Sequence, residues 1–331
     1  MTPAIRRRRF LGVAALCPAL LQLGCGSSPV AERKNPQKQG LVFTYFRNNG
    51  EDGLHLASSE DGLVWTPLHG DKPILAPTVG ESKLMRDPSI VQGPDGRFHM
   101  VWTTSWEGRT IGYAHSGDLR NWSPQQAIPV MEHEKDVSNC WAPEIFYDEQ
   151  QQEFVVVWAS TIRGRFPETA ATGEKERNHR LYAFRTKDFQ QIGASELFYD
   201  PGFLVIDAAI FEPRPKRDGP KRYAMVVKNE ARFPPAKNLF LTYAPSLRGP
   251  WSAPSSPISG EEWAEGPTPV RIGDQWYIYF DKYRIGRYGA IRSKDLERWE
   301  DLTDQCVFPE GMRHGTVFHA PQSIIDALKP A

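Results

Sequence analysis

The sequence predicts an all-β fold, a five-bladed β-propeller, because one short phrase recurs, strand-like runs surround it, and long helical periodicity is absent. The phrase is a Ser or Thr, then an Asp two positions later, then a Trp four positions after that Asp. Full copies occupy residues 59–65, 116–122 and 293–299, and weaker copies occupy residues 186–192 and 246–251. Five copies at intervals of about 47 to 70 residues indicate one supersecondary unit used five times.

Strand-like runs of alternating polar and apolar residues, separated by tight turns, make up each unit. In the second unit, runs 89–92 and 97–102 flank the sequence Gly-Pro-Asp-Gly at 93–96, which is a strong hairpin signal. The first unit, residues 41–68, contains only three clear strands. We expect residues 315–319 to supply the missing strand, so that the C-terminal strand pairs with the first blade and closes the ring.

Turn chemistry explains the phrase itself, because Ser, Thr and Asp side chains bond nearby backbone N–H groups and hold a bend. We therefore expect the aspartates of the phrase to be structural: Asp61, Asp118, Asp188 and Asp295. Two insertions interrupt the pattern. Residues 212–222 are expected to form a solvated hairpin tip, whereas residues 161–180 are long enough to reach over a binding face.

Residues 1–25 are expected to be an export signal of twin-arginine type, followed by a tether over residues 26–40. Four arginines at 6–9 precede an apolar run that is too short to span a bilayer. The sequence Leu-Gly-Cys ending at Cys25 is similar to a lipobox, which predicts a lipid on Cys25 and membrane attachment, although Gln22 replaces the usual aliphatic residue. Secretion without a lipid and an uncleaved cytoplasmic segment are the alternatives. The protein is thus expected to be exported, as a periplasmic, membrane-anchored or secreted protein.

The charge balance argues against a nucleic-acid partner, because 40 Lys and Arg residues match 40 Asp and Glu residues. Beyond Cys25, the processed chain would keep only Cys140 and Cys306. Two cysteines cannot build a disulfide framework, so they either pair across blades or remain free thiols. Residues 41–320 suffice for one large all-β domain, residues 321–331 form a C-terminal tail, and we expect a monomer.

The innermost strands of a propeller line its central axis, so that side chains at one end of those strands converge on a single funnel. The phrases expected there are Arg-Asp-Pro-Ser-Ile at 86–90, Trp-Ala-Pro-Glu-Ile at 141–145, Val-Ile-Asp-Ala-Ala-Ile-Phe at 205–211 and Glu-Gly-Pro-Thr at 265–268. Each phrase has an acidic residue near its start. Four carboxylates at equivalent positions of successive units indicate a functional constellation.

These four phrases, in this order and at this spacing, resemble glycoside hydrolase family 43 across residues 41–319. That family consists of five-bladed propellers that act as arabinofuranosidases, xylosidases and arabinanases. One such phrase alone would be weak evidence, whereas all four in order are specific. The resemblance implies a carbohydrate substrate and no required cofactor.

The resemblance makes Asp87 the general base, Glu265 the general acid and Asp207 the carboxylate that tunes this acid. Inverting hydrolysis requires one carboxylate to activate water and a second, protonated one to protonate the leaving oxygen. The negative charge of Asp207 is expected to raise the pKa of Glu265 and keep this acid protonated near neutral pH.

Four further residues are candidates for substrate binding. Trp141 and Trp106 are expected either to stack on a sugar ring or to pack in the interior. Glu144 departs from the Asp that is frequent at this place in relatives, which leaves its role open. Asp52 either reaches the pocket from the first blade or serves as a turn residue.

Two basic residues are candidates through the resemblance. Arg287 resembles the arginine that contacts substrate in the family, with a surface role as the alternative. His314 resembles the family's axial histidine, near which a calcium or sodium ion often lies in the central channel. An ordinary hydrogen-bonded histidine is the alternative, so no metal ligand is assigned with certainty.

The expected function is that of an exported, inverting, exo-acting glycosidase that removes terminal α-L-arabinofuranose from plant-type polysaccharides. β-Xylosidase and galactofuranosidase activities are the nearest alternatives. The furanosidases of fructan and sucrose share an Arg-Asp-Pro phrase, but the nucleophile phrase that they use is absent here. A carbohydrate-binding propeller without catalysis is the non-enzymatic alternative, and the presence of base, modulator and acid together favours the enzyme.

Overall fold

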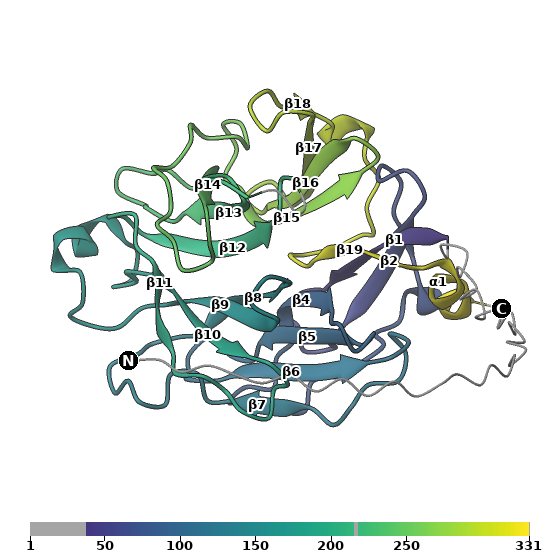
Figure 1. Cartoon of the computed structure of the whole chain (residues 1–331), viewed down its shortest axis with the longest axis horizontal. Coiled ribbons are helices and arrows are strands. Elements are labelled where there is room, and N and C mark those ends of the chain that lie inside the picture. Colours follow the sequence, from purple (N-terminus) through teal and green to yellow (C-terminus); the bar gives the residue numbers. More distant parts are fainter. Residues whose placement is uncertain (1–37, 215–217, 331) are drawn as a thin grey trace, which may run out of the picture. The chain divides into compact units, whose positions relative to one another are not determined.

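The computed structural model describes residues 38–214 and 218–330, which form five antiparallel sheets and little helix (Figure 1). The sheets are called blades 1 to 5 here. Blade 1 contains β19 (Val317–Pro321), β1 (Gln39–Tyr45), β2 (His55–Ser59) and β3 (Thr66–Pro67); blade 2 contains β4 (Arg86–Gln92), β5 (Phe98–Thr103), β6 (Ile111–Ser116) and β7 (Gln126–Ile128). Blade 3 contains β8 (Trp141–Asp148), β9 (Glu153–Ser160), β10 (Arg180–Thr186) and β11 (Glu196–Tyr199); blade 4 contains β12 (Val205–Phe211), β13 (Tyr223–Asn229) and β14 (Leu239–Ala244); blade 5 contains β15 (Glu265–Ile272), β16 (Gln275–Lys282), β17 (Arg287–Ser293) and β18 (Glu300–Asp301).

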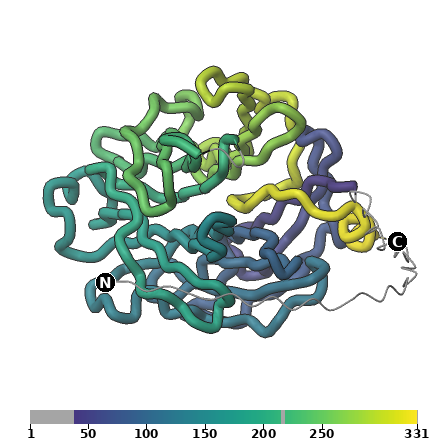
Figure 2. The backbone as a smooth tube through the Cα atoms, viewed as in Figure 1, coloured from purple at the N-terminus to yellow at the C-terminus, as the bar shows by residue number. Residues whose placement is uncertain are grey.

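The inner strands of the five blades follow one another around a closed ring. β4 contacts β8, β8 contacts β12, β12 contacts β15, β15 contacts β19, and β1 contacts β4. In blade 1, β19 pairs antiparallel with β1, with Val317 opposite Phe43 and Pro321 opposite Gln39. Figure 2 shows this closure, with the yellow C-terminal segment beside the purple start of the propeller. The predicted five-bladed propeller, closed by its C-terminal strand, is confirmed.

The expected export segment, including Cys25, and the tether up to residue 37 lie outside the described residues. Within those residues, no helix is long and apolar enough to cross a bilayer. The single described α-helix, α1 (Gln322–Leu328), lies in the segment expected to be a tail. Its Ile325 and Leu328 side chains are buried and pack with the apolar residues of blades 1 and 2.

The aspartates of the repeated phrase hold turns, as predicted. The Asp61 carboxylate accepts hydrogen bonds from the backbone N–H groups of Leu63 at 2.8 Å and Val64 at 3.1 Å. The other three aspartates each accept two backbone N–H bonds at the same offsets of two and three residues. These turns join the two outermost strands of blades 1, 2, 3 and 5, away from the axis.

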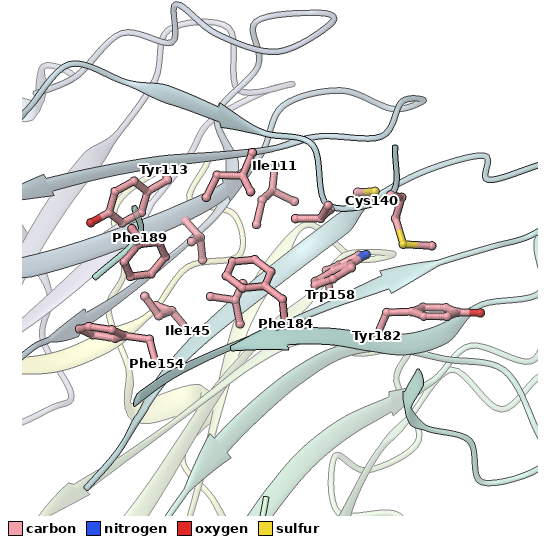
Figure 3. Close-up of a cluster of buried hydrophobic side chains, with 14 of the residues drawn as sticks. Ile111, Tyr113, Cys140, Ile145, Phe154, Trp158, Tyr182, Phe184 and Phe189 are labelled. Atoms are coloured by element: carbon pink, nitrogen blue, oxygen red, sulfur yellow. The ribbon is translucent and has the colours of Figure 1, made fainter. Parts of the chain in front are cut away.

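Large apolar side chains fill the spaces between adjacent blades. Figure 3 shows the cluster between blades 2 and 3, in which Tyr113 stacks on Phe189 with ring centroids 3.9 Å apart and Trp158 is fully buried. Burial of each such side chain stabilises the fold by about 1.5–3 kcal/mol. Cys140 is buried in this cluster, and both Cys140 and Cys306 are free thiols. Of the two alternatives for the cysteines, the structure has the unpaired one.

A β-bulge lies near the start of the inner strand in blades 2 to 5. At each bulge, two residues of the inner strand oppose one of its neighbour, and the register shifts at 86–89, 141–144, 206–209 and 265–268. The second residue of each of these ranges has a left-handed backbone, with φ of 52° at Asp87, 44° at Ala142, 53° at Asp207 and 59° at Gly266. Bulges re-aim side chains at the rims of β-structures, and here they turn one end of these four inner strands toward the axis.

The residue with the left-handed backbone in each bulge is called the bulge residue here. The side chains two positions after the bulge residues join one blade to the next. The Ser89 hydroxyl accepts the Ile145 N–H at 3.1 Å, and the Thr268 hydroxyl accepts the Val317 N–H at 2.8 Å. Glu144 occupies the same place in blade 3, where its carboxylate accepts the Ile210 N–H at 3.4 Å. The Ser89 hydroxyl donates to the other oxygen of Glu144 at 2.7 Å. Glu144 is therefore a link in a ring of hydrogen bonds between blades.

In blade 4 the corresponding residue is Ala209, which has no side-chain acceptor, and the residue that would donate to it is Pro269, which has no N–H. The ring is closed at this place by Asp207, whose carboxylate accepts the Gly266 N–H at 3.0 Å. The missing donor and the missing acceptor thus match, and no polar group is left unsatisfied.

Replacing Glu144 tests the ring. Glu144→Ala removes the acceptor of the Ile210 N–H and should lower the free energy of unfolding by about 1–3 kcal/mol, measured by denaturant unfolding at pH 5. Glu144→Gln keeps an oxygen acceptor and should lower it much less. If both variants lost the same stability, Glu144 would not act through this hydrogen bond.

Glu144 also gives a pH dependence. Burial raises the pKa of Glu144 from 4.5 to about 7, so the folded protein binds more protons than the unfolded chain between these values. Its contribution to stability is present at low pH and declines as the pH rises from about 4.5 through about 7. Glu144→Gln should show a smaller decline over this range.

Candidate active site

The three carboxylates predicted to be catalytic line one cavity of about 240 Å³ at the axial end of the inner strands. Asp87 comes from blade 2, Asp207 from blade 4 and Glu265 from blade 5. Asp87 and Asp207 are both bulge residues, whereas Glu265 directly precedes the bulge residue of its strand. The expectation that the acidic residues occupy equivalent positions therefore holds for the two aspartates only.

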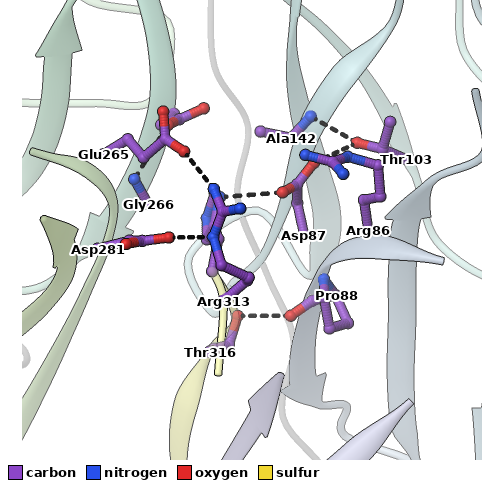
Figure 4. Close-up of polar contacts among 12 residues, drawn as sticks. Arg86, Asp87, Pro88, Thr103, Ala142, Glu265, Gly266, Asp281, Arg313 and Thr316 are labelled. Carbon is purple, nitrogen blue, oxygen red and sulfur yellow. Dashed lines mark hydrogen bonds and ion pairs between the residues drawn. The ribbon is translucent and has the colours of Figure 1, made fainter. Parts of the chain in front are cut away.

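Asp87 is held in its ionised form. Its carboxylate accepts a hydrogen bond from the Thr103 hydroxyl at 2.8 Å, and it pairs with Nδ1 of His314 at 3.3 Å (Figure 4). Burial alone would raise the pKa of Asp87, but the hydrogen bond and charge of His314 outweigh burial and lower it to about 2. Asp87 is therefore available as a proton acceptor throughout the acidic and neutral range.

His314 is the cation that matches Asp87. Burial would lower its pKa, yet the bond to Asp87 and the nearby carboxylates raise the pKa of His314 to about 9. A protonated imidazole has no free lone pair for a metal. Among residues 38–214 and 218–330, no group of three or more His, Cys, Asp or Glu side chains is arranged to hold a metal ion. An ion near His314 in the central channel therefore stays a prediction.

Glu265 lies between two cations. Its carboxylate is 2.9 Å from Nζ of Lys228 and accepts a hydrogen bond from Nη2 of Arg313 at 3.0 Å. Burial would raise the pKa of Glu265, but the charges of Lys228 and Arg313 lower it below its ordinary value. The expectation that Asp207 holds Glu265 protonated near neutral pH is therefore wrong, because two adjacent positive charges outweigh one negative charge.

Asp207 is the carboxyl group that retains a proton. It is 6% exposed, and burial raises its pKa to about 6, helped by the charges of Glu265 and Asp87 and opposed by those of His314 and Lys228. Asp207 and Glu265 lie on the adjacent blades 4 and 5 and interact with each other. In this pair the proton resides on Asp207. The cavity therefore holds one carboxyl group with a pKa of about 2, Asp87, and one with a pKa of about 6, Asp207, beside the lowered pKa of Glu265.

The cations at Glu265 belong to a network that the sequence did not reveal. Lys228 also pairs with Glu230 at 2.8 Å, and Lys237 pairs with the same carboxylate. Arg313 also pairs with Asp281 (Figure 4). Lys228 could have been noticed as a lysine near the end of an otherwise apolar strand. Arg313 lies just before β19 in blade 1, and Glu265 lies just before the bulge of β15 in blade 5. A comparison of the positions before the inner strands would therefore have indicated Arg313 as a candidate site residue.

Both predicted aromatic residues line the cavity. Nε1 of Trp141 donates to the carbonyl oxygen of Trp106 at 3.0 Å, and the two rings meet edge to face. Trp106 is 48% exposed, and the Arg86 guanidinium lies 4.2 Å from its ring centroid. The Arg177 guanidinium lies 4.6 Å from the ring centroid of Trp141. Stacking of either ring on a sugar remains a prediction.

The long insertion at 161–180 contributes to this face of the molecule. It contains a short 3₁₀ turn, η2 (Pro167–Thr172), followed by Glu174, which lines the cavity. Arg177, which covers Trp141, comes from the same insertion. The insertion therefore reaches the cavity, as its length suggested.

Three predicted binding residues are not among those that line the cavity. Arg287 begins β17, the third strand from the axis, and its guanidinium bonds the Thr303 carbonyl and Asp304. Asp52 lies in the loop between β1 and β2, where its carboxylate pairs with His55 at 2.8 Å. Glu144 is engaged in the ring between blades. Arg287 and Asp52 do not line the cavity because they lie too far from the axis. Glu144 does not line it because the register of the bulge directs its side chain toward the neighbouring blade.

Solved structures with the same architecture are distant in sequence. A β-1,3-galactosidase of glycoside hydrolase family 43, solved with galactodeoxynojirimycin, has 12% identity and a TM-score of 0.51, and the match covers 68% of this chain and 77% of that one. An exo-β-1,3-galactanase from Phanerochaete chrysosporium has 14% identity and a TM-score of 0.49, with 68% and 51% covered. An α-L-arabinofuranosidase from Lactobacillus brevis has 15% identity and a TM-score of 0.47, with 66% and 72% covered. At these identities, only the likeness to the galactosidase carries weight, and it shows the fold alone.

No curated protein matches the sequence. Residues 37–324 match a family described as a probable glycosyl hydrolase domain related to glycoside hydrolase family 43. This match spans all five blades, including the strand that closes the ring. The chain therefore belongs to the family of probable glycosyl hydrolase domains related to glycoside hydrolase family 43.

Proposed function

We propose that the protein is an inverting glycosidase that hydrolyses a terminal O-glycosidic bond. One observation carries the proposal. A cavity wall holds Asp87 with a pKa of about 2 and, on other blades, the pair of Asp207 and Glu265, whose proton leaves near pH 6. A base that stays ionised and an acid that stays protonated to a higher pH are what this hydrolysis requires.

In the proposed step, Asp87 takes a proton from a water molecule as the water oxygen bonds to the anomeric carbon. The bond from that carbon to the glycosidic oxygen breaks, and the departing oxygen takes the proton held by the pair. The proton passes from Asp207 to Glu265, which delivers it, because the Glu265 side chain is 21% exposed while the Asp207 carboxylate accepts the Gly266 N–H. Asp87 then releases its proton to solvent and Asp207 recovers one from solvent, so that the site returns to its initial state.

The size of the cavity supports action on a chain end. Its volume of about 240 Å³ is below the roughly 300–1,000 Å³ common for small-molecule sites. A terminal sugar fits this description better than several sugars of a continuous chain. The candidates from the sequence are α-L-arabinofuranose first, then β-D-xylose and galactofuranose, and the corresponding aryl glycosides form the first substrate panel.

Glu265→Gln tests the proposed acid. Its kcat should fall by about 10²–10⁴ on a substrate with a poor leaving group, because protonation of the departing oxygen is lost. On an activated aryl glycoside, which needs little protonation, the loss should be much smaller.

Asp87→Asn is the matched control, because loss of the base should slow both substrates alike. Equal losses on both substrates for Glu265→Gln would contradict its role as acid. Undiminished binding with no turnover of any glycoside by the unaltered protein would indicate a carbohydrate-binding propeller instead.

We also propose that the protein is exported and carries a lipid on Cys25, which supports access to polysaccharides outside the cytoplasm. In cells that produce the full chain, Cys25→Ala should move the protein from the membrane fraction to the soluble exported fraction, measured by fractionation and intact mass. An unchanged membrane fraction and a mass without lipid would contradict the anchor.

A further inference from the structure

One buried cation in the cavity wall has no carboxylate partner. The described residues contain five buried Lys or Arg side chains, and four of these form ion pairs: Arg180 with Asp200, Lys228 with Glu265, Lys237 with Glu230, and Lys282 with Asp301. The fifth is Arg86, which is 9% exposed and lines the cavity. No carboxylate among the described residues lies within ion-pair distance of its guanidinium.

The surroundings of Arg86 hold the guanidinium in place without neutralising its charge. It lies between two aromatic rings, 4.7 Å from the centroid of Phe46 and 4.2 Å from that of Trp106. Its only hydrogen bond within the described residues is to the side-chain oxygen of Asn49, at 3.2 Å. A guanidinium has five N–H donors in a fixed planar fork, so most of its donors remain for a ligand.

The neighbouring carboxylates form no ion pair with Arg86, although its charge contributes to the lowered pKa of Asp87. Asp87 is matched by His314, and Glu265 is matched by Lys228 and Arg313. A buried cation without a partner costs free energy, and an anion that arrives with a ligand offsets this cost. Arg86 thus brings a buried positive charge to the wall of the cavity with which no described carboxylate pairs directly.

We infer that the saccharide bound in this cavity carries a carboxylate and that Arg86 binds it, so that the substrate contains a uronic acid. A carboxylate accepts two parallel N–H bonds from a guanidinium, a geometry that neutral hydroxyl groups do not reproduce. Arg86 directly precedes the proposed base Asp87 in β4, which places this carboxylate beside the sugar whose bond is broken. The inference rests on the proposed function in taking this cavity as the substrate site, and it changes the preferred substrate from a neutral pentose to an acidic sugar.

The test is a binding measurement that does not depend on turnover. Titration calorimetry with the full chain compares methyl D-glucuronide with methyl D-glucoside, and methyl D-galacturonide with methyl D-galactoside. One acidic sugar should bind about ten- to hundredfold more tightly than its neutral counterpart, as expected for a charge-assisted pair. Arg86→Gln should abolish this preference, and Arg86→Lys should retain part of it, because the charge remains without the fork.

Arg284→Gln is the matched control, because Arg284 is an exposed arginine near another residue of the cavity wall, Trp263. The Arg284 guanidinium lies 4.6 Å from the ring centroid of Trp263. This variant should keep the preference. Equal binding of acidic and neutral sugars by the unaltered protein would overturn the inference, even if neutral glycosides were hydrolysed. Loss of preference in Arg284→Gln alone, or tighter binding of a 6-O-sulfated galactoside than of the galacturonide, would also overturn it.

Arg86→Gln is replaced in this test if its thermal unfolding shows that it does not fold. In that case Arg86→Lys and the salt dependence of binding test whether Arg86 binds the carboxylate of the sugar. Binding of the acidic sugar by the unaltered protein should then weaken with added salt, while binding of the neutral sugar should not. Identical salt dependence for the two sugars would contradict a buried charge pair. Acidic-sugar binding without hydrolysis of any glycoside would leave the inference intact and count against the glycosidase.

Discussion

The bulge near the start of the inner strand in blades 2 to 5 is the constraint on which the site depends. A regular antiparallel pair would alternate side chains between the faces of a blade and aim none of them along the axis. The bulge instead places Asp87 and Asp207 in left-handed backbone conformations, which cost about 1–3 kcal/mol each for residues other than glycine. In blade 5 the same position is Gly266, where a Cβ atom would lie 2.4 Å from Cγ of His314. The histidine that ionises Asp87 therefore occupies space that only glycine leaves open.

The same geometry connects fold stability with chemistry. The Gly266 N–H, which follows Glu265 in sequence, is bonded by Asp207 across the junction of blades 4 and 5. The two members of the proposed acid pair are thus fixed relative to each other by a bond that also joins the blades. Around the ring, hydroxyl groups and Glu144 make the equivalent links. A change in the packing of blades would consequently change the distance between the groups that exchange protons.

Cations then divide the carboxylates into different protonation states. His314 keeps Asp87 ionised, while Lys228 and Arg313 lower the pKa of Glu265 and leave the proton of the pair on Asp207. These cations pair directly with the carboxylates of the wall, whereas Arg86 has no ion-pair partner among the described residues and keeps N–H donors for a ligand.

The repeated phrase was sufficient to predict the fold, because turn chemistry is local and recurs at each blade. It also showed where each repeating unit begins and which strand is innermost, and this identified the three carboxylates before any contact was known. The partners of those carboxylates could not be predicted in this way. Lys228 reaches Glu265 from a neighbouring blade, and Arg313 reaches it across the closure of the ring, so both depend on packing between distant segments. The position of Glu144 depends on the bulge. The extra residue of a bulge cannot be recognised from the alternation of polar and apolar residues in the sequence.

The separation of carboxyl pKa values is the central claim, and NMR titration of ¹³C-labelled Asp and Glu side chains measures it directly. The full chain should show Asp87 titrating near pH 2 and Asp207 near pH 6. Glu265 should titrate below its ordinary value, and its pKa should rise in Lys228→Gln because a neighbouring positive charge is removed. Titration of Asp87 and Asp207 at the same pH, or a Glu265 pKa that Lys228→Gln leaves unchanged, would contradict the proposed division of roles.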